Sequence, residues 1–236
     1  MALAAEQALV RRPPGGAERW TRTNHRGASV TLLSGPALAV AAGATARSPG
    51  SFVAALGAGA VGAYDDLVGG AGAKGFRGHL TSLARGELTT GAVKIGGLAA
   101  VGAVAALRHR PDVLLGGAVV AGSANVLNLL DLRPGRALKT GTVLALALGE
   151  PGVAGACAAL LSGDLGERTM LGDTGANALG AVLGVALLRR LPGRRSKLGA
   201  LGVLAGLTAA SEVVSYSAVI DRTPWLRRLD QLGRRP

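Results

Sequence analysis

The apolar positions of the chain form long runs that no Asp, Glu, Lys or Arg interrupts. The runs cover residues 27–46, 48–64, 95–107, 113–130, 140–149, 151–163, 174–188 and 198–211. A helix that crosses a bilayer needs about 20 mostly apolar residues, within a range of about 17–25. The runs at 27–46, 48–64 and 113–130 have this length directly, and those at 174–188 and 198–211 reach it with neutral or amphipathic flanks.

Two further stretches are candidate membrane segments although each contains one charged residue. Residues 88–107 have the required length if Lys94 faces the interior of a bundle. Residues 140–163 contain a Glu-Pro-Gly sequence, and because Pro and Gly side by side interrupt helices, we predict two short crossings here. The pattern therefore predicts an all-α, polytopic membrane protein with about eight transmembrane helices and short loops, in a single domain over residues 1–236.

Composition and charge narrow the class of protein further. The 236 residues include 49% apolar and 17% charged residues, with a formal net charge of +12. The apolar content excludes a disordered chain, and the single Cys157 excludes a disulfide framework and a cysteine-based zinc site. A soluble α/β enzyme, rich in Ala and Gly because of a GC-rich genome, is the alternative. We favour the membrane protein, because so many regularly spaced apolar runs are hard to bury in one soluble domain.

The basic residues indicate how the predicted helices are oriented. With eight segments both termini lie on the same side, and the loops on that side carry most of the Lys and Arg residues. Since Lys and Arg prefer the cytoplasmic side, we place that side in the cytoplasm, at a cell inner membrane. The basic N-terminal stretch 1–26 and the basic tail 221–236 lie there, whereas the basic cluster 189–197 is an exception on the other side. The tail is amphipathic and is typical of a helix that lies on anionic lipid.

Three polar clusters fall at the predicted cytoplasmic ends of apolar runs. They consist of Tyr64-Asp65-Asp66, of Asn125, Asn128 and Asp131, and of the segment 172–177 with Asp173 and Asn177. Polar and ionisable residues near membrane depth are costly and are therefore functional candidates. Each cluster alone is equally well explained as a helix boundary, for example with Asp173 as a helix cap. Three acidic clusters on one face can nevertheless converge in a bundle, which favours a common site.

Converging carboxylates suit Mg²⁺, which proteins usually hold with one or two carboxylates together with substrate phosphates. The basic loops 74–79 and 133–139 supply Lys and Arg side chains that suit phosphate oxygens. The glycines around Asp173, at the start of the next predicted helix, offer backbone N–H groups to an anion. Together these features predict metal-assisted phosphoryl chemistry on a lipid-linked phosphate.

At these clusters the sequence resembles the polyprenyl-phosphate N-acetylhexosamine-1-phosphate transferases, the family that contains the phospho-MurNAc-pentapeptide translocase. Tyr64-Asp65-Asp66 matches the paired-aspartate motif of the family, and the segment 125–131 is similar to its NAxNLxDG segment. Residues 170–176, MLGDTGA, resemble its MGDTGS motif and run on to a Leu-Gly pair, as in the family.

Weaker matches lie around these motifs. Residues 24–27 and 34–35 resemble the first cytoplasmic stretch of the family, and Lys94 lies where a helix lysine follows the paired aspartates. The matching segments occur in the family's order over residues 24–189, about two thirds of the chain.

The resemblance implies an enzyme in which a polyprenyl phosphate attacks the β-phosphate of a UDP-amino sugar. UMP is released, and a lipid-linked diphospho-sugar remains for cell-wall (peptidoglycan) synthesis. The resemblance also implies a Mg²⁺ requirement, with Asp173 as the metal ligand. It places Asp65 and Asp66 beside the lipid phosphate, with one of the pair as a candidate general base. The side chains implied to bind substrate are those of Lys94, Asn125, Asn128, Asp131 and Asn177.

The chain departs from the family at Pro134, where the family has a second acidic residue, and it has no histidine after His109. Two hypotheses therefore stay open: a divergent, shortened transferase, or an inactive relative that binds polyprenyl phosphate or an envelope-assembly partner. A transporter with coupling-ion sites at the acidic residues is a third, which the motif order disfavours. The partners we expect are the lipid, the UDP-amino sugar and the membrane, with a homodimer left open and no nucleic acid.

Overall fold

The computed structural model describes residues 1–24, 26–69, 90–108 and 112–235, and this part of the chain is almost entirely helical. The predicted all-α class is confirmed. The elements are α1 (Ala2–Arg11), a 3-10 turn η1 (Ala17–Trp20), β1 (Thr21–Thr23), β2 (Ser29–Thr31), α2 (Ser34–Thr45), α3 (Pro49–Val68), α5 (Thr90–Ala105), α6 (Val113–Leu130), α7 (Arg136–Leu148), α8 (Pro151–Leu165), α9 (Gly172–Leu188), α10 (Arg194–Val213), α11 (Tyr216–Arg222) and α12 (Pro224–Gln231).

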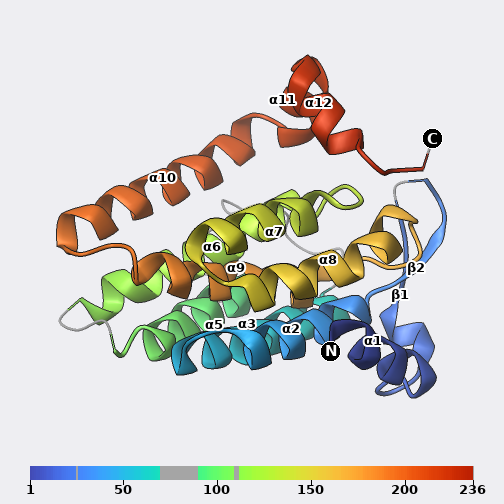
Figure 1. Ribbon diagram of the computed structural model, residues 1–236, viewed down its shortest axis with the longest axis horizontal. Coiled ribbons are helices and arrows are strands. Elements are labelled where there is room, and N and C mark those ends of the chain that lie inside the picture. The colour runs from blue at the N-terminus through green and yellow to red at the C-terminus, as the bar shows by residue number, and fades with distance from the viewer. Residues whose placement is uncertain (25, 70–89, 109–111, 236) are drawn as a thin grey trace.

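Helix α9 is the central helix of the bundle. All of its residues except Asp173 and Leu187 are buried, because α2, α3, α6 and α7 pack around it. A helix that is apolar on every side is expected to be buried in this way. Figure 1 shows the bundle with α10 running along one side and with α11 and α12 near one end.

Glycines allow the backbones of neighbouring helices to come very close together. A Cβ atom on Gly180 of α9 would lie 2.6 Å from the Cα of Ala124 in α6. A Cβ on Gly117 of α6 would lie 2.7 Å from the backbone nitrogen of Ala103 in α5. Small residues at helix contacts permit such approach. The high glycine content of the chain therefore has a direct packing role.

The two helices α3 and α6 both run antiparallel to α9. Gly62, near the end of α3, packs on the backbone of Asp173 at the start of α9, whereas Gly50, at the start of α3, lies near Val185. Gly184 lies one turn after Gly180 in α9. A Cβ on Gly184 would meet the Cα of Val120, which lies one turn before Ala124 in α6. The C-terminal ends of α3 and α6 and the N-terminal end of α9 therefore meet at one end of the bundle, which we call the acidic end.

The opposite end of the bundle is closed around Glu150, which is completely buried. Its carboxylate forms an ion pair with Arg189 at the end of α9 and accepts a hydrogen bond from the backbone nitrogen of Arg47, at 3.1 Å. Helix α7 ends at Leu148 and α8 begins at Pro151, so the predicted break between two short helices in residues 140–163 is confirmed.

Only some of the helices have the length and composition of a membrane span. Within the described residues these are α3 and α6, or three spans if α10 and α11, bent by 86°, are counted as one. The prediction of about eight transmembrane helices is not supported. The other apolar helices are shorter, with 12 residues in α2 and 17 in α9. At about 1.5 Å per residue, a helix like α2 reaches only about 18 Å, against a hydrocarbon core of about 30 Å.

The close contact between α6 and α9 yields a prediction about stability. Gly180→Ala would drive a methyl group into the α6 backbone, and we expect a loss of about 1–3 kcal/mol in the free energy of unfolding, as for other overpacked cores. Gly206→Ala, in the middle of α10 where a Cβ meets nothing within 4 Å, is the matched control. We expect it to be neutral or to stabilise by about 0.5–1 kcal/mol. Thermal unfolding of the purified variants measures both; equal melting temperatures would contradict the packing described.

Candidate functional site

The acidic end brings together charged residues from four segments that are far apart in the sequence. Asp65 and Asp66 lie in the last turn of α3, Lys94 lies near the start of α5, and Asp173 lies in the first turn of α9. Asp131 follows directly after α6. The polar clusters at residues 64–66, 125–131 and 172–177 therefore contribute to one region through these aspartates.

Lys94 joins two of these carboxylates. Its ammonium group donates a hydrogen bond to Oδ2 of Asp65 at 3.1 Å and forms a second ion pair with Oδ2 of Asp173. All three side chains are largely buried, with between 14% and 24% of their surface exposed. The lysine thus separates two negative charges that would otherwise repel each other, and it holds a positive charge at the end of α3.

Asp66 binds the N-terminus of α9. Its Oδ1 accepts from the backbone nitrogen of Asp173 at 3.0 Å, and its Oδ2 accepts from the backbone nitrogen of Thr174 at 2.9 Å and from Oγ1 of Thr174 at 2.6 Å. The first N–H groups of a helix have no partner within the helix and carry a partial positive charge, so a carboxylate here is stabilising. The cap of α9 therefore comes from α3, and Asp173 is left to contact Lys94.

Asp131 is buried and only partly satisfied. Its carboxylate is 6% exposed and accepts a hydrogen bond from the backbone of Gly172, whereas Oδ2 has no hydrogen-bond partner. Burial, followed by the negative charge of Asp164, raises the pKa of Asp131 well above its usual value. A buried polar atom without a partner is costly, and native proteins contain few of them.

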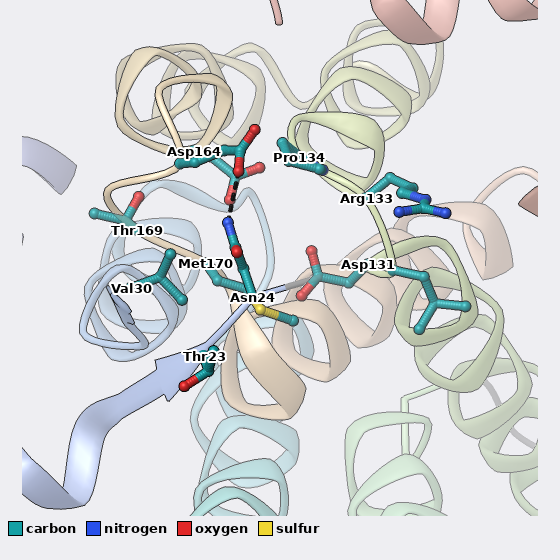
Figure 2. A pocket seen from close by; sticks show the side chains of 11 residues that line it. Thr23, Asn24, Val30, Asp131, Arg133, Pro134, Asp164, Thr169 and Met170 are labelled. Carbon is teal, nitrogen blue, oxygen red and sulfur yellow. Dashed lines mark hydrogen bonds between the residues drawn. The ribbon is translucent and has the colours of Figure 1, made fainter. Parts of the chain in front are cut away.

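The Asp131 carboxylate faces a cavity of about 160 Å³. Figure 2 shows this carboxylate pointing toward Asn24 and Met170, and the Arg133 guanidinium pointing away from them. The complete lining is Thr23, Asn24, Val30, Asp131, Leu132, Arg133, Pro134, Asp164, Glu167, Thr169 and Met170.

Two side chains help to define how this cavity can interact with a ligand. Glu167 accepts a hydrogen bond from the Asn24 amide at 2.6 Å, and the buried hydroxyl of Thr169 has no partner. Cavities that hold whole drug-sized ligands are larger, about 300–1,000 Å³. The size therefore suits one ring-sized group that donates hydrogen bonds to carboxylates.

The short β-hairpin holds this cavity against the start of α9. β1 and β2 pair antiparallel with Arg22 opposite Val30. Thr31, the last residue of β2, also forms a parallel bridge with Thr169. The backbone of Thr31 accepts from the nitrogen of Met170 at 2.9 Å. The loop that leads into α9 is therefore fixed by the N-terminal part of the chain.

The three asparagines predicted to bind substrate lie in different surroundings. The Asn125 amide donates to Oγ1 of Thr208 in α10 at 3.0 Å, so its bond points to another helix and not to the charged cluster. Asn128 is half-buried on the last turn of α6. Asn177 is completely buried in α9, and neither its amide nitrogen nor its amide oxygen has a hydrogen-bond partner. Asn177 thus resembles Asp131 in carrying unused hydrogen-bonding capacity.

The basic loops predicted to bind phosphate are only partly described. The loop 74–79 and His25 lie outside the described residues. In the loop 133–139, Arg133 lines the cavity, but Arg136 is paired with Asp230, and Lys139 donates to the carbonyl oxygens of Leu229 and Asp230. These two cations are therefore engaged by the C-terminal helix α12 and not by an open phosphate site.

Several residues of this region were not predicted from the sequence. Thr174 bonds Asp66, and Asp164 and Glu167 line the cavity. Thr174 belongs to the segment 172–177, where its position next to Asp173 was a usable signal. Asp164 and Glu167 follow the apolar run at 151–163, as the other acidic clusters adjoin their own runs, so the same criterion could have selected them.

The carboxylates of this region partly meet the needs of Mg²⁺. Within the described residues, no group of three or more His, Cys, Asp or Glu side chains is arranged to hold a metal ion. Asp65 and Asp173 nevertheless direct one carboxylate oxygen each at the same cation, the ammonium of Lys94. Mg²⁺ is commonly held by only one or two carboxylates plus phosphate and water, and the number of carboxylates at this pair is compatible with that requirement.

The buried and only partly satisfied carboxylate of Asp131 yields a prediction about pH. Because its folded pKa is raised above the unfolded value of about 3.9, protonated Asp131 stabilises the protein at low pH, and this contribution is lost as the pH rises through the folded pKa. Asp131→Asn does not titrate, so we expect the variant to melt above the wild type at pH 7–8 and the difference to shrink as the pH falls toward 4. Melting temperatures over this range test the prediction. A difference that grows on acidification would contradict it.

No protein-family model matches the chain, and neither a curated protein nor a solved structure matches it.

Proposed function

We propose that the chain transfers a sugar-1-phosphate from a UDP-amino sugar to a polyprenyl phosphate, releasing UMP, in the synthesis of cell-envelope precursors. The observation that carries the proposal is the cluster in which Lys94 is shared by Asp65 and Asp173 at the capped N-terminus of α9. Such a cluster combines a cation and a pair of carboxylates, which are the kinds of group that bind phosphates and a divalent ion.

The membrane location of this chemistry is supported by α3 and α6, which are long and apolar enough to cross a bilayer. Both helices end at the acidic end, so the cluster would lie where the lipid phosphate lies, at the membrane surface. Positive charge favours the cytoplasmic side, and the sequence carries arginines at 11, 12, 19 and 22 before the first apolar run. We therefore place the acidic end at the cytoplasmic face of an inner membrane.

The reaction is a displacement at phosphorus. An oxygen of the lipid phosphate attacks the β-phosphorus of the UDP-sugar, a new P–O bond forms, and the bond from that phosphorus to the oxygen bridging to UMP breaks. UMP leaves with the bridging oxygen and its electron pair. A phosphate monoester has a second pKa of about 6, so the nucleophile is already largely ionised near pH 7 and little general-base catalysis is needed.

The residues of the cluster would position and neutralise the phosphates. The Lys94 ammonium would contact phosphate oxygens, and Asp66 fixes the start of α9 through three hydrogen bonds. Asp65 and Asp173 would hold the Mg²⁺ ion, which when bound supplies charge neutralisation to the diphosphate. Most of the rate enhancement in phosphoryl transfer comes from positioning and charge stabilisation of this kind.

One ring of the donor would occupy the cavity beside Asp131. Its lining offers the unpaired Oδ2 of Asp131 and the unpaired hydroxyl of Thr169, both of which can accept hydrogen bonds from ring or hydroxyl groups. Asn128 and Asn177 lie on the two helices that lead to this region, α6 and α9. We assign Asn128 to substrate binding on the nucleotide side, and Asn177, which is completely buried, stays a candidate polar contact.

A second candidate function is binding of polyprenyl phosphate without catalysis. It is favoured by the ion pairs of Lys94, which neutralise Asp65 and Asp173 from within the protein and make a bound metal ion unnecessary for charge balance. Pro134, next to Arg133 in the cavity wall, also favours binding without catalysis, because the family that the sequence resembles has an acidic residue at this position.

UMP release by the reconstituted protein tests the first function. We expect release from one member of a panel of UDP-amino sugars, dependent on polyprenyl phosphate and Mg²⁺, and a loss of roughly 100-fold or more in Asp173→Asn and Lys94→Met, because each removes a preorganised charge. Asp112→Asn is the matched control, since this carboxylate lies at the other end of α6. We expect it to keep wild-type activity.

The same preparations separate the two candidates. Release that is unchanged in Asp173→Asn would contradict the proposed transferase. No release with any donor, combined with polyprenyl-phosphate binding that is lost in Lys94→Met and kept in Asp112→Asn, would establish the second candidate in its place.

A further inference from the structure

The C-terminal helix α12 is attached to the rest of the protein by its polar side. Its Asp230 is 8% exposed and accepts hydrogen bonds from Nε of Arg136 at 2.8 Å and from its terminal nitrogen at 3.0 Å. Lys139, one turn further along α7, donates to the carbonyl oxygens of Leu229 and Asp230 at 3.1 and 2.8 Å. Bidentate arginine–carboxylate pairs of this kind fix orientation as well as contact.

The opposite side of α12 is apolar and faces away from the protein. Trp225, Leu229 and Leu232 are 63%, 58% and 68% exposed. Trp225 and Leu229, four residues apart, lie along one face of the helix, and Leu232 follows directly after its last residue. A helix on the surface of a soluble protein usually buries its apolar face and exposes its polar face. In α12 this arrangement is inverted, so its apolar face is directed toward the surroundings.

Positive charge flanks the exposed apolar face. Arg228 is exposed and directly precedes Leu229, Arg227 is exposed on the side of the helix away from Leu229, and Arg222 and Arg235 extend the basic stretch on both sides. The carboxylate of Asp230 does not offset this charge, because it is paired with Arg136 and with Arg234. Basic helices with Trp and Leu on one face bind anionic bilayers, with the apolar side chains below the headgroups and the cations among the phosphates.

The position of α12 relative to the membrane-capable helices α3 and α6 also suits contact with a membrane surface. Figure 1 shows α11 and α12 beyond the end of α10, near the C-terminus of the chain. Nε of Arg234 donates to the carbonyl oxygen of Pro134 at 2.9 Å, and Pro134 lies in the wall of the cavity at the acidic end. The helix is therefore held at the end of the bundle where α3 and α6 terminate.

From these observations we infer that α12 is a lipid-binding element that lies in the headgroup region of an anionic membrane, with Trp225, Leu229 and Leu232 inserted. Its polar side stays bound to α7, so the helix joins the protein to the membrane surface. Lipid binding by α12 does not require that the chain transfer a sugar-1-phosphate, and the two are tested separately.

Tryptophan fluorescence can report on this surface, because the chain has two tryptophans. Trp20 is 5% exposed and Trp225 is 63% exposed. Trp20→Phe leaves Trp225 as the reporter, and Trp225→Phe leaves the buried Trp20 as the control. The full chain is reconstituted into phosphatidylcholine vesicles with and without phosphatidylglycerol, each containing lipids brominated at a shallow or a deep acyl position.

We expect Trp225 emission to shift to shorter wavelength and to be quenched by the shallow bromines more than by the deep ones, with stronger quenching when phosphatidylglycerol is present. The double variant Arg227→Gln/Arg228→Gln should lose the dependence on phosphatidylglycerol. The double variant Arg11→Gln/Arg12→Gln removes two exposed arginines at the N-terminus and should keep it. The Trp20 reporter should change little between the vesicles.

Two outcomes would overturn the inference. One is Trp225 emission that stays at the wavelength of water-exposed tryptophan and is insensitive to the brominated lipids. The other is burial of Trp225 in detergent that rises with protein concentration, which would assign the surface to a second copy of the chain.

A second reporter covers the case in which Trp20→Phe does not fold. Leu229→Cys can be labelled with an environment-sensitive dye, because the native Cys157 is fully buried. The same lipid dependence is expected from this label, and its absence would count against the inference in the same way.

Discussion

The acidic end depends on the hydrogen bonds between the Asp66 carboxylate and the N-terminus of α9. The carboxylate belongs to the last turn of α3, and the groups that it binds are the first free N–H groups of α9. Because it satisfies these groups from outside the helix, Asp173 is released from the role of a cap and can face Lys94. The same hydrogen bonds set Asp65, one residue earlier on α3, close enough to share the lysine. One capping interaction thus determines the relative positions of three charged side chains.

The sequence was most informative about local structure. Uninterrupted apolar runs identified most of the helices, and the Glu-Pro-Gly sequence identified the break between α7 and α8. The number of membrane spans was not predictable in this way, because a run of uncharged residues measures composition and not the length of a helix. Helices rich in Ala and Gly can instead be short and bury one another. Gly180 against Ala124 and Gly117 against Ala103 are contacts of this kind, in which the backbones of two helices pack directly against each other.

The sequence predicted which aspartates form the candidate site, but not the hydrogen bonds and ion pairs that they make. The motifs pointed to Asp65, Asp66, Asp131 and Asp173, and the structure places all four at the acidic end. Their individual partners were not accessible, because each lies on a segment distant in sequence. Arg136 is an example, since its partner Asp230 lies almost a hundred residues later. Asn125 is another, because Thr208 on α10 takes the amide that was expected to serve a substrate.

The glycine contacts of α9 have a consequence for how this sequence can change over time. A methyl group at Gly62, Gly180 or Gly184 would meet the backbone of a neighbouring helix, and backbone atoms cannot be exchanged by substituting another residue. These positions can therefore accept almost no residue other than glycine. Exposed apolar positions such as Leu114, which is 82% exposed, are free to vary among residues of similar hydrophobicity. Distant relatives of this chain would be recognised more readily by the spacing of its glycines than by the identity of its large apolar residues.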